Sequence, residues 1–332
     1  MDRKAIGTVF VAALVLAGGP ASMASGQPPP ERYPSRPIRL IQPFPPGGGA
    51  DVAARFVAQQ ISEKLGQTVV VDNRGGAGGA IGTEIAAQSA PDGYTLLMAT
   101  VSTIVINPLV NRVRFDPIRD FDPVVHVSTV PLILVVHPSV PAKSVRELIN
   151  LARAQPGKIN FASSGEGTIS HLAGELFKIL TATDLVHVPY RGGGPARTAL
   201  IAGEVQVNFG NMLASAADVR AGRLRALAVS TPRRTDGMPE VPTLQEAGVP
   251  QYEVLQWSGI LAPRGAPASR IELVNREVNR VLATQKAREF FLAGGSEPGG
   301  GSPQAFGALI RSDIAKWSQI VKQVKISSGL NP

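Results

Sequence analysis

Short runs of aliphatic and β-branched residues alternate along the chain with longer stretches whose apolar positions recur every three or four residues. In the first half, the apolar runs predict strands at 38–41, 68–71 and 95–99. The stretch 51–65 places its apolar residues on one helical face, and a shorter predicted helix ends near Gln88. Because strands and helices alternate, we expect parallel strands joined by right-handed crossovers.

The second half of the chain repeats this alternation. Its apolar runs predict strands at 132–136, 159–162, 185–188, 205–208 and 224–229. Ser144 and Glu147 have the spacing of a capping box, which predicts the start of a helix. Further helices are predicted at 170–180, from Pro195 and between the last two strands, and the stretch 306–324 has amphipathic spacing. For a chain of 332 residues this pattern predicts two α/β domains.

The N-terminus has the three-part pattern of a secretory signal peptide. A charged start precedes an apolar run over 5–17, and the small residues Ser22 and Ala24 suit a signal peptidase. A membrane anchor is the alternative, but the run is shorter than the roughly 20 residues that cross a bilayer. We therefore expect residues 1–24 to be a cleaved signal peptide and the mature protein to be periplasmic.

Composition narrows the class of partner and of chemistry. The chain has no cysteine, which excludes disulfides, thiolate metal sites and cysteine nucleophiles. Its net charge is +8, from 33 Lys and Arg against 25 Asp and Glu, yet no basic run is longer than Arg233-Arg234. Spread positive charge with only 5% aromatic residues argues against a nucleic-acid partner. The excess charge mildly favours anionic ligands.

The candidate chemistry lies in four glycine-rich loops, each between a predicted strand and a predicted helix. We name them loop one (43–51), loop two (73–79), loop three (163–170) and loop four (190–194). Helix N-termini carry unpaired N–H groups and partial positive charge, and glycine lets a ligand oxygen approach those groups. In open α/β sheets ligands lie at the carboxyl ends of strands. The pattern predicts an anion site, although any one loop alone is also typical of a tight turn.

Other chemistries fit the sequence less well. Loop two reads Gly76-x-Gly78-x-x-x-Gly82, one residue too long for a dinucleotide fingerprint, and the P-loop pattern is absent. No two of the four histidines stand three or four positions apart, so a helical metal motif is absent and we expect no metal. We also expect no cofactor. Ser164 with His171 remains a nucleophile and base for a secreted hydrolase, although the chain has no Gly-x-Ser-x-Gly elbow. His171, near a helix start, is alternatively a ligand contact.

These loops, in this order after a signal peptide, resemble the extracytoplasmic solute-binding proteins of the tripartite tricarboxylate transporter (Bug-type) family. The similarity covers essentially the whole mature chain. The segments that carry it are 33–38, 43–51, 73–79, 91–96, 188–192, 224–229, 239–243 and 257–259. The sequence departs from the family pattern after Phe209, where Gly210 and Asn211 stand in place of the usual acidic residue. Asn211 is a candidate neutral substitute for that acid.

The resemblance implies an α/β, two-lobed periplasmic binding protein of the type II, Venus-flytrap class, with two crossover strands as a hinge. Lobe one would span 33–127 plus 252–332, and lobe two would span 128–251. It also implies transport: a membrane permease would receive the ligand. We expect a monomer. A receptor that presents its closed form to a signalling partner is the alternative, because both roles need the same hinge.

The resemblance further implies that the ligand is a small organic acid. Backbone N–H groups of loops one and two would hold its carboxylate, with hydroxyls near Ser102 and Thr103. The candidate contacts in loops one and two are Phe44, Pro45, Gly47, Gly48, Asn73 and Gly78. The distal end of the ligand would meet Ser164, Gly165, Thr168, Tyr190, Arg191 and Gly192.

Overall fold

The computed structural model describes residue 2 and residues 33–324. The first part of this described chain contains a parallel three-stranded unit. β1 (Ile38–Gln42) lies between β2 (Val69–Asn73) and β3 (Thr95–Thr100) and runs parallel to both. The connections contain α1 (Gly49–Leu65), the 3-10 turn η1 (Ala77–Gly79) and α2 (Ala80–Ala87). These elements confirm the predicted strands and helices, and α1 begins two residues before the predicted start. The expected signal peptide lies, apart from residue 2, outside the described residues.

A second unit repeats this arrangement. β5 (Ile159–Ser163) lies between β6 (Leu185–Pro189) and β7 (Val207–Asn211), again parallel to both. Its helices and its last strand are α4 (Val145–Ala154), α5 (Ile169–Thr181), α6 (Gly193–Ile201), α7 (Met212–Arg220) and β8 (Arg225–Val229). The N-cap Ser144 accepts a hydrogen bond from the Glu147 N–H at 3.2 Å, as the capping box predicts.

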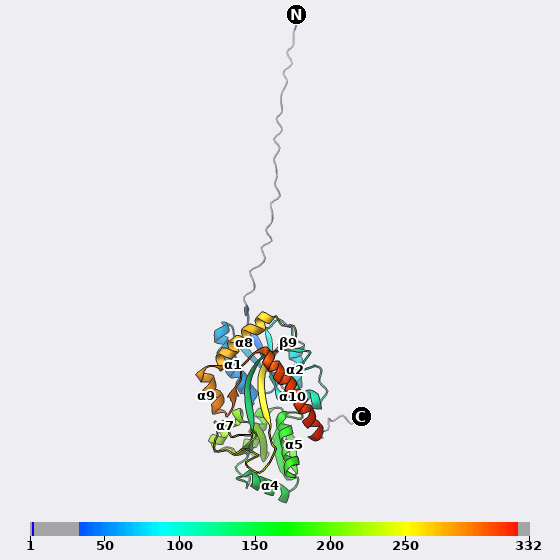
Figure 1. The fold of residues 1–332 in the computed structure, drawn as a ribbon, viewed down its shortest axis with the longest axis vertical. Helices are drawn as coiled ribbons and strands as arrows, with labels where there is room; N and C mark the ends of the chain where they lie inside the picture. The colour runs from blue at the N-terminus through cyan, green and yellow to red at the C-terminus, as the bar shows by residue number, and fades with distance from the viewer. Residues whose placement is uncertain (1, 3–32, 325–332) are drawn as a thin grey trace. The chain divides into compact units, whose positions relative to one another are not determined.

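Two long antiparallel strands join the units. β4 (Phe121–Val136) pairs with β9 (Leu255–Pro263) from Phe121 to Pro131, and with β7 and β8 from Leu132 onward. β3 pairs with β9, and the short β10 (Glu297–Pro298) pairs with β4. The strand order is β2-β1-β3-β9-β4-β7-β5-β6, and β4 and β9 run side by side through the centre of Figure 1.

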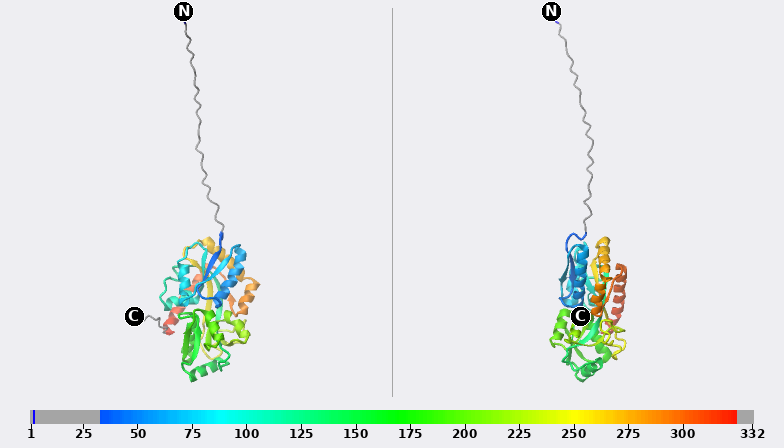
Figure 2. Two further views of the ribbon diagram at one scale, coloured as in Figure 1. Left: turned by 180° about the vertical axis from the view of Figure 1, so that it is seen from behind. Right: turned by 90° about the vertical axis from the view of Figure 1, so that its left-hand side faces the viewer.

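The sheet therefore has two parts. We name β1, β2, β3, β9, β10 and the start of β4 the first half-sheet, and the end of β4 with β5 to β8 the second half-sheet. In Figure 2 the blue and orange elements gather around the first half-sheet and the green elements around the second. The predicted strand at 132–136 is only the last part of β4, and β9 was not predicted from the hydrophobic pattern.

The remaining helices cover the sheet. They are the π-helical segment η2 (Val101–Ile106), α3 (Asn107–Val110), α8 (Ala268–Leu282), α9 (Gln285–Ala293) and α10 (Pro303–Val324). α10 packs on β4 and η2 and reaches α5 of the second half-sheet. Trp257 of β9 meets the Phe306 ring edge-on, with ring centroids 5.2 Å apart. Among the described residues, no helix combines the length and the hydropathy needed to span a membrane.

Candidate functional site

The four glycine loops lie at the carboxyl ends of β1, β2, β5 and β6, and they meet in pairs. Loop one contacts loop four: a Cβ built on Gly48 would lie 3.7 Å from the Gly194 nitrogen, and one on Gly194 would overlap the Pro46 carbonyl oxygen. Loop two contacts loop three in the same way, since a Cβ on Gly78 would lie 2.8 Å from the Glu166 carbonyl oxygen. The Ile169 N–H at the end of loop three donates to Ser102 Oγ at 3.0 Å. Loops from both half-sheets therefore close on one another.

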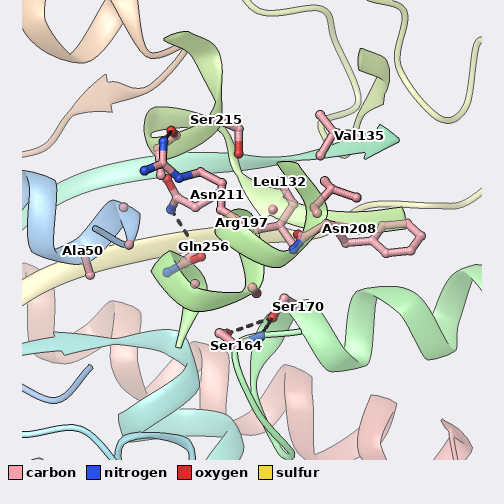
Figure 3. Close-up of a pocket in the computed structure, with 18 of the residues that line it drawn as sticks. Ala50, Leu132, Val135, Ser164, Ser170, Arg197, Asn208, Asn211, Ser215 and Gln256 are labelled. Carbon is pink, nitrogen blue, oxygen red and sulfur yellow. Dashed lines mark hydrogen bonds between the residues drawn. The ribbon is translucent and has the colours of Figure 1, made fainter. Parts of the chain in front are cut away.

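An inner pocket of about 60 Å³ lies behind loops one and four. Residues of both half-sheets surround it, and Figure 3 shows Ser164 and Ser170 on one side with Asn208, Asn211 and Ser215 on another. Its lining is Phe44, Gly48, Gly49, Ala50, Asp51, Ser102, Leu132, Val135, Ser164, Ser170, Gly193, Ala196, Arg197, Leu200, Asn208, Phe209, Gly210, Asn211, Ala214, Ser215, Leu224 and Gln256. This volume is sufficient for several water molecules or for part of a small metabolite.

A second, wider space, a groove of about 780 Å³, also has Phe44 in its lining. Residues of loops two, three and four line this groove. Its lining is Phe44, Gly75, Gly76, Ala77, Gly78, Gly79, Ala80, Ile81, Asn107, Asn111, Arg112, Ser164, Gly165, Glu166, Pro189, Tyr190 and Arg191. Burial and the nearby Glu204 raise the pKa of Tyr190, so its phenol stays neutral at physiological pH. Phe44 and Ser164 line both spaces.

Helix N-termini give the site a positive electrostatic character. α1, α5, α6 and α7 begin beside the inner pocket, and the N-cap residue of each makes no side-chain capping hydrogen bond. The first N–H of α5, that of Ile169, is satisfied by Ser102 Oγ instead. Of the helices that begin elsewhere, α4 is capped by Ser144 and α9 by Thr284, whereas α2, α3 and α8 also lack a side-chain cap. The four helices bring the positive ends of their dipoles, and first-turn N–H groups without a helical partner, to the edge of the pocket. An anion is the ligand that this arrangement suits.

The charged side chains that line the inner pocket have partners within the protein. The Asp51 carboxylate is 3% exposed and accepts hydrogen bonds from the Gly47 N–H, Arg55 and Asn73 at 2.9–3.0 Å. Arg197 Nη1 donates to Asp218 Oδ2 at 2.9 Å and to the Ala214 carbonyl oxygen. Asp51 therefore shapes loop one, and its negative charge is compensated next to the anion site.

The structure places many of the predicted site residues on the two spaces. Phe44, Gly48, Ser102, Ser164 and Asn211 line the inner pocket. Gly78, Gly165, Tyr190 and Arg191 line the groove. The carboxamide of Asn211 lies against the first turn of α1, where a Cβ on Gly49 would overlap it.

Other predicted residues support the loops without lining either space. Asn73 Nδ2 donates to the Phe44 carbonyl oxygen at 2.8 Å, and Thr168 Oγ1 donates to the Gly165 carbonyl oxygen at 2.7 Å. Thr103 exchanges capping hydrogen bonds with Thr100 at the start of η2. Pro45, Gly47 and Gly192 form the contact between loops one and four. These residues position the backbone that faces the ligand.

His171 does not activate Ser164. Ser164 Oγ is hydrogen bonded to Ser170 Oγ at 2.8 Å, whereas His171 Nδ1 accepts from the Gly167 N–H at 3.3 Å. The His171 ring stacks on His187 with centroids 3.9 Å apart, and burial lowers the pKa of His171. The geometry thus gives no support to the hydrolase alternative, because a nucleophile and its base must share a hydrogen bond.

Several lining residues were not predicted. Ser170, Arg197, Asn208, Ser215 and Gln256 join the inner pocket from α5, α6, β7, α7 and β9. Asn208 carried no distinctive signal, since it shares the polar positions of the alternating stretch 205–209 with Gln206. The described residues contain no group of three or more His, Asp or Glu that could hold a metal ion.

Comparisons with known proteins agree with this geometry. Residues 53–326 match the family described as "Tripartite tricarboxylate transporter family receptor". BugT of Bordetella pertussis is 39% identical over 295 residues, which are 88% of this chain and 90% of BugT.

Two solved structures from Rhodopseudomonas palustris show the same fold. Rpa4515, solved with adipate, is 38% identical with a TM-score of 0.87, and the match covers 89% of this chain and 99% of that one. MatC, solved with bound malate, is 29% identical with a TM-score of 0.83, and the match covers 87% and 100%. The α/β fold is thus that of the periplasmic binding proteins. The chain belongs to the tripartite tricarboxylate transporter receptor family, whose members are solute-binding proteins and not enzymes.

Proposed function

We propose that this receptor captures a small organic carboxylate in the periplasm and delivers it to a membrane permease. The observation that carries the proposal is the convergence of loops one, three and four and of four helix N-termini on one pocket, with loop two on a groove that shares Phe44 and Ser164 with that pocket. The adipate of Rpa4515 and the malate of MatC support a carboxylate ligand, because both proteins share the fold over most of this chain.

In this proposal the carboxylate accepts hydrogen bonds from the backbone at the start of α1, around Gly48, and from loop two around Gly78. Ser102 contributes a hydroxyl at the same end. Ser164, Gly165, Tyr190 and Arg191 contact the ligand from the side of the second half-sheet. Asn211 lies beside the α1 N-terminus. The residues that hold these loops in place are Pro45, Gly47, Asn73, Thr103, Thr168, His171 and Gly192.

We also propose that the protein is a monomer with two lobes that move relative to one another. Lobe one spans residues 33–127 with 252–332, and lobe two spans residues 128–251. The sheet pairing supports a division within β4, whose partners change between Pro131 and Leu132, four residues beyond the proposed boundary. Residues 1–24 would direct export and be cleaved.

The magnitudes require several loops to act together. Micromolar affinity corresponds to about 8 kcal/mol. One helix terminus contributes about 0.3–2 kcal/mol, and a charge-assisted hydrogen bond contributes about 1.5–3 kcal/mol. No single loop reaches the total, so the ligand must be bound while loops from both half-sheets enclose it.

Calorimetric titration of the purified protein with C3 to C8 mono- and dicarboxylates tests the proposal. We expect at least one acid to bind with micromolar affinity and to raise the melting temperature, and to be recovered unchanged. Absence of binding across the panel would overturn it. Uptake of that radiolabelled acid in a deletion strain separates transport from signalling, since only a transport receptor's loss abolishes uptake.

A further inference from the structure

The inner pocket extends beyond the glycine loops into the layer between the second half-sheet and α6 and α7. This inner arm has an apolar wall that includes Val135, Ala196, Leu200 and Leu224. Asn208 of β7 is paired with Val135 of β4, so both side chains leave the sheet on this face. Asn208 thus places a carboxamide among aliphatic side chains.

The oxygen of the Asn208 carboxamide lacks a partner in the described structure. The residue is 4% exposed, and its buried Oδ1 makes no hydrogen bond. Ser215, 3% exposed, lies close to it: a Cβ built on Gly210 would be 3.0 Å from Asn208 Oδ1 and from Ser215 Oγ. Glycine at 210 therefore leaves open the space that both polar groups face. Because buried polar groups in native proteins are nearly always hydrogen bonded, a bound group is expected there.

The charge around this arm indicates which kind of group it is. Arg197 also lines the pocket and has a buried Nε without a partner, but its Nη1 is paired with Asp218 at 2.9 Å. Arg223, the other partner of Asp218, is more than half exposed. Asp218 pairs with the Arg197 guanidinium inside the protein, while the second cation of the cluster, Arg223, is screened by solvent. A carboxylate buried here would therefore lose its hydration without an unpaired cation to replace it, which disfavours it. A neutral group can use the Asn208 acceptor and the Arg197 Nε donor together.

We infer that Asn208 and Ser215 form a specificity subsite for an uncharged ligand end that both donates and accepts hydrogen bonds, a hydroxyl or a carboxamide. An aliphatic chain joins this end to the carboxylate held at the glycine loops. The inference rests on the proposed function, because it uses that carboxylate as the anchor. Whichever way the Asn208 amide is oriented, its oxygen or its nitrogen is left to form a hydrogen bond with such a group.

The test is calorimetric titration with straight-chain carboxylates of four, five and six carbons. At each length the far end is a methyl, a hydroxyl, a carboxamide or a second carboxylate. We expect the hydroxyl or carboxamide member of the best-fitting length to bind at least tenfold more tightly than the methyl and dicarboxylate members. In Asn208→Leu this preference should fall below threefold, with methyl-ended affinity unchanged or increased. Ser215→Ala should reduce the preference in the same direction.

Asn160→Leu is the matched control, because Asn160 lies on β5 of the same half-sheet and lines neither space; it should keep the wild-type preference. Thermal unfolding checks that each variant folds. Equal binding of hydroxyl and methyl members by the wild type, tighter dicarboxylate binding, or an equal loss for both members in Asn208→Leu would overturn the subsite while the proposed function stands. If no carboxylate of any length binds, the proposed function fails, and the subsite fails with it.

Discussion

At the scale of single residues, the pocket presents main-chain N–H groups at its mouth and compensated charges around it. Gly48 illustrates the first point, because its φ of −80° is open to any residue and a Cβ there would meet only ordinary contacts at 3.7–3.8 Å. Asp218 illustrates the second, since its carboxylate is 1% exposed and joins Arg197 and Arg223. Substitution of Gly48 should therefore affect ligand binding, whereas substitution of Asp218 should affect the stability of the fold.

Gly48→Val should weaken carboxylate binding about tenfold or more, which is about 1.4 kcal/mol, while the melting temperature changes little. The branched side chain would cover the N–H groups at the start of α1. Gly48→Ala is the control, because its Cβ fits without overlap, and it should lose less affinity. Calorimetric titration measures both. If Gly48→Val binds like the wild type, loop one is only a turn.

Asp218→Asn should lower the free energy of unfolding by about 2 kcal/mol, because the partly buried Arg197 loses its counter-charge. Urea denaturation monitored by circular dichroism gives the value. Arg223→Ala should cost less, since Arg223 is more than half exposed. The interpretation fails if the arginine variant is the more destabilised of the two.

At the scale of elements, loops one and four form a close contact between the parts of the chain that surround the two half-sheets. Gly193 and Gly194 begin α6 and face loop one, yet they differ in the space that each has. A Cβ on Gly193 would lie 3.7 Å from the Gly48 Cα, whereas one on Gly194 would overlap the Pro46 carbonyl oxygen. Substitution of these two neighbouring glycines therefore distinguishes an effect on helix α6 from an effect on the contact between loops one and four.

Gly194→Ala should reduce carboxylate affinity at least tenfold, because the added methyl group keeps loops one and four apart. The free energy of unfolding should stay the same or rise slightly, since alanine favours the helix. Gly193→Ala should bind as the wild type does. Titration and thermal unfolding of the pair distinguish closure from folding. Equal affinities for the two variants would contradict a role of this contact in binding.

The elements also differ in how well the sequence predicts them. β1 to β3 and β5 to β6 are short runs between turns in which apolar residues predominate, and their predictions are confirmed. β4 was predicted only over its last five residues, because Pro123 and Pro131 interrupt the pattern and lack N–H groups. The ladder accommodates the first of these with a register shift between Pro123 and Val125. β9 combines Trp257, Ser258 and Gly259, which follow no period-two pattern.

At the scale of the whole molecule, the site depends on how two distant loop pairs meet. The sequence predicts each glycine loop, since a strand precedes it and a helix follows. It does not predict Asn208 or Ser215 as neighbours of loop one, because their approach depends on the packing of α7 and on the shared strands. Long-range pairing of this kind leaves no local trace in the order of residues.

Acid should destabilise the protein between about pH 6.5 and pH 4. Burial, with the neighbouring His171 and Lys178, lowers the pKa of His187 from 6.5 to about 3, and burial also lowers the pKa of His171. In this window the unfolded chain binds protons that the folded chain does not, so the free energy of unfolding falls as pH falls. The carboxylates of Asp72 and Asp120, whose pKa values are lowered, act only below about pH 4.

His187→Phe tests this origin, because it keeps a ring stacked between His171 and Phe161 and removes the titration. Melting temperatures measured from pH 7 to pH 4 should decline less steeply in the variant than in the wild type. The buried His126, whose pKa is also lowered, supplies a remaining slope. Parallel profiles for the two proteins would assign the acid sensitivity elsewhere.

The long strand β4 has a mechanical consequence. Its first part is laddered to β9 and its last part to β7 and β8, without a break in the chain. A sliding displacement of one half-sheet past the other would have to rupture a whole row of interstrand hydrogen bonds. Bending or twisting of the shared ribbon keeps them intact. The architecture therefore favours rotation of one half-sheet relative to the other over translation. After each rotation the same backbone atoms return to the same register.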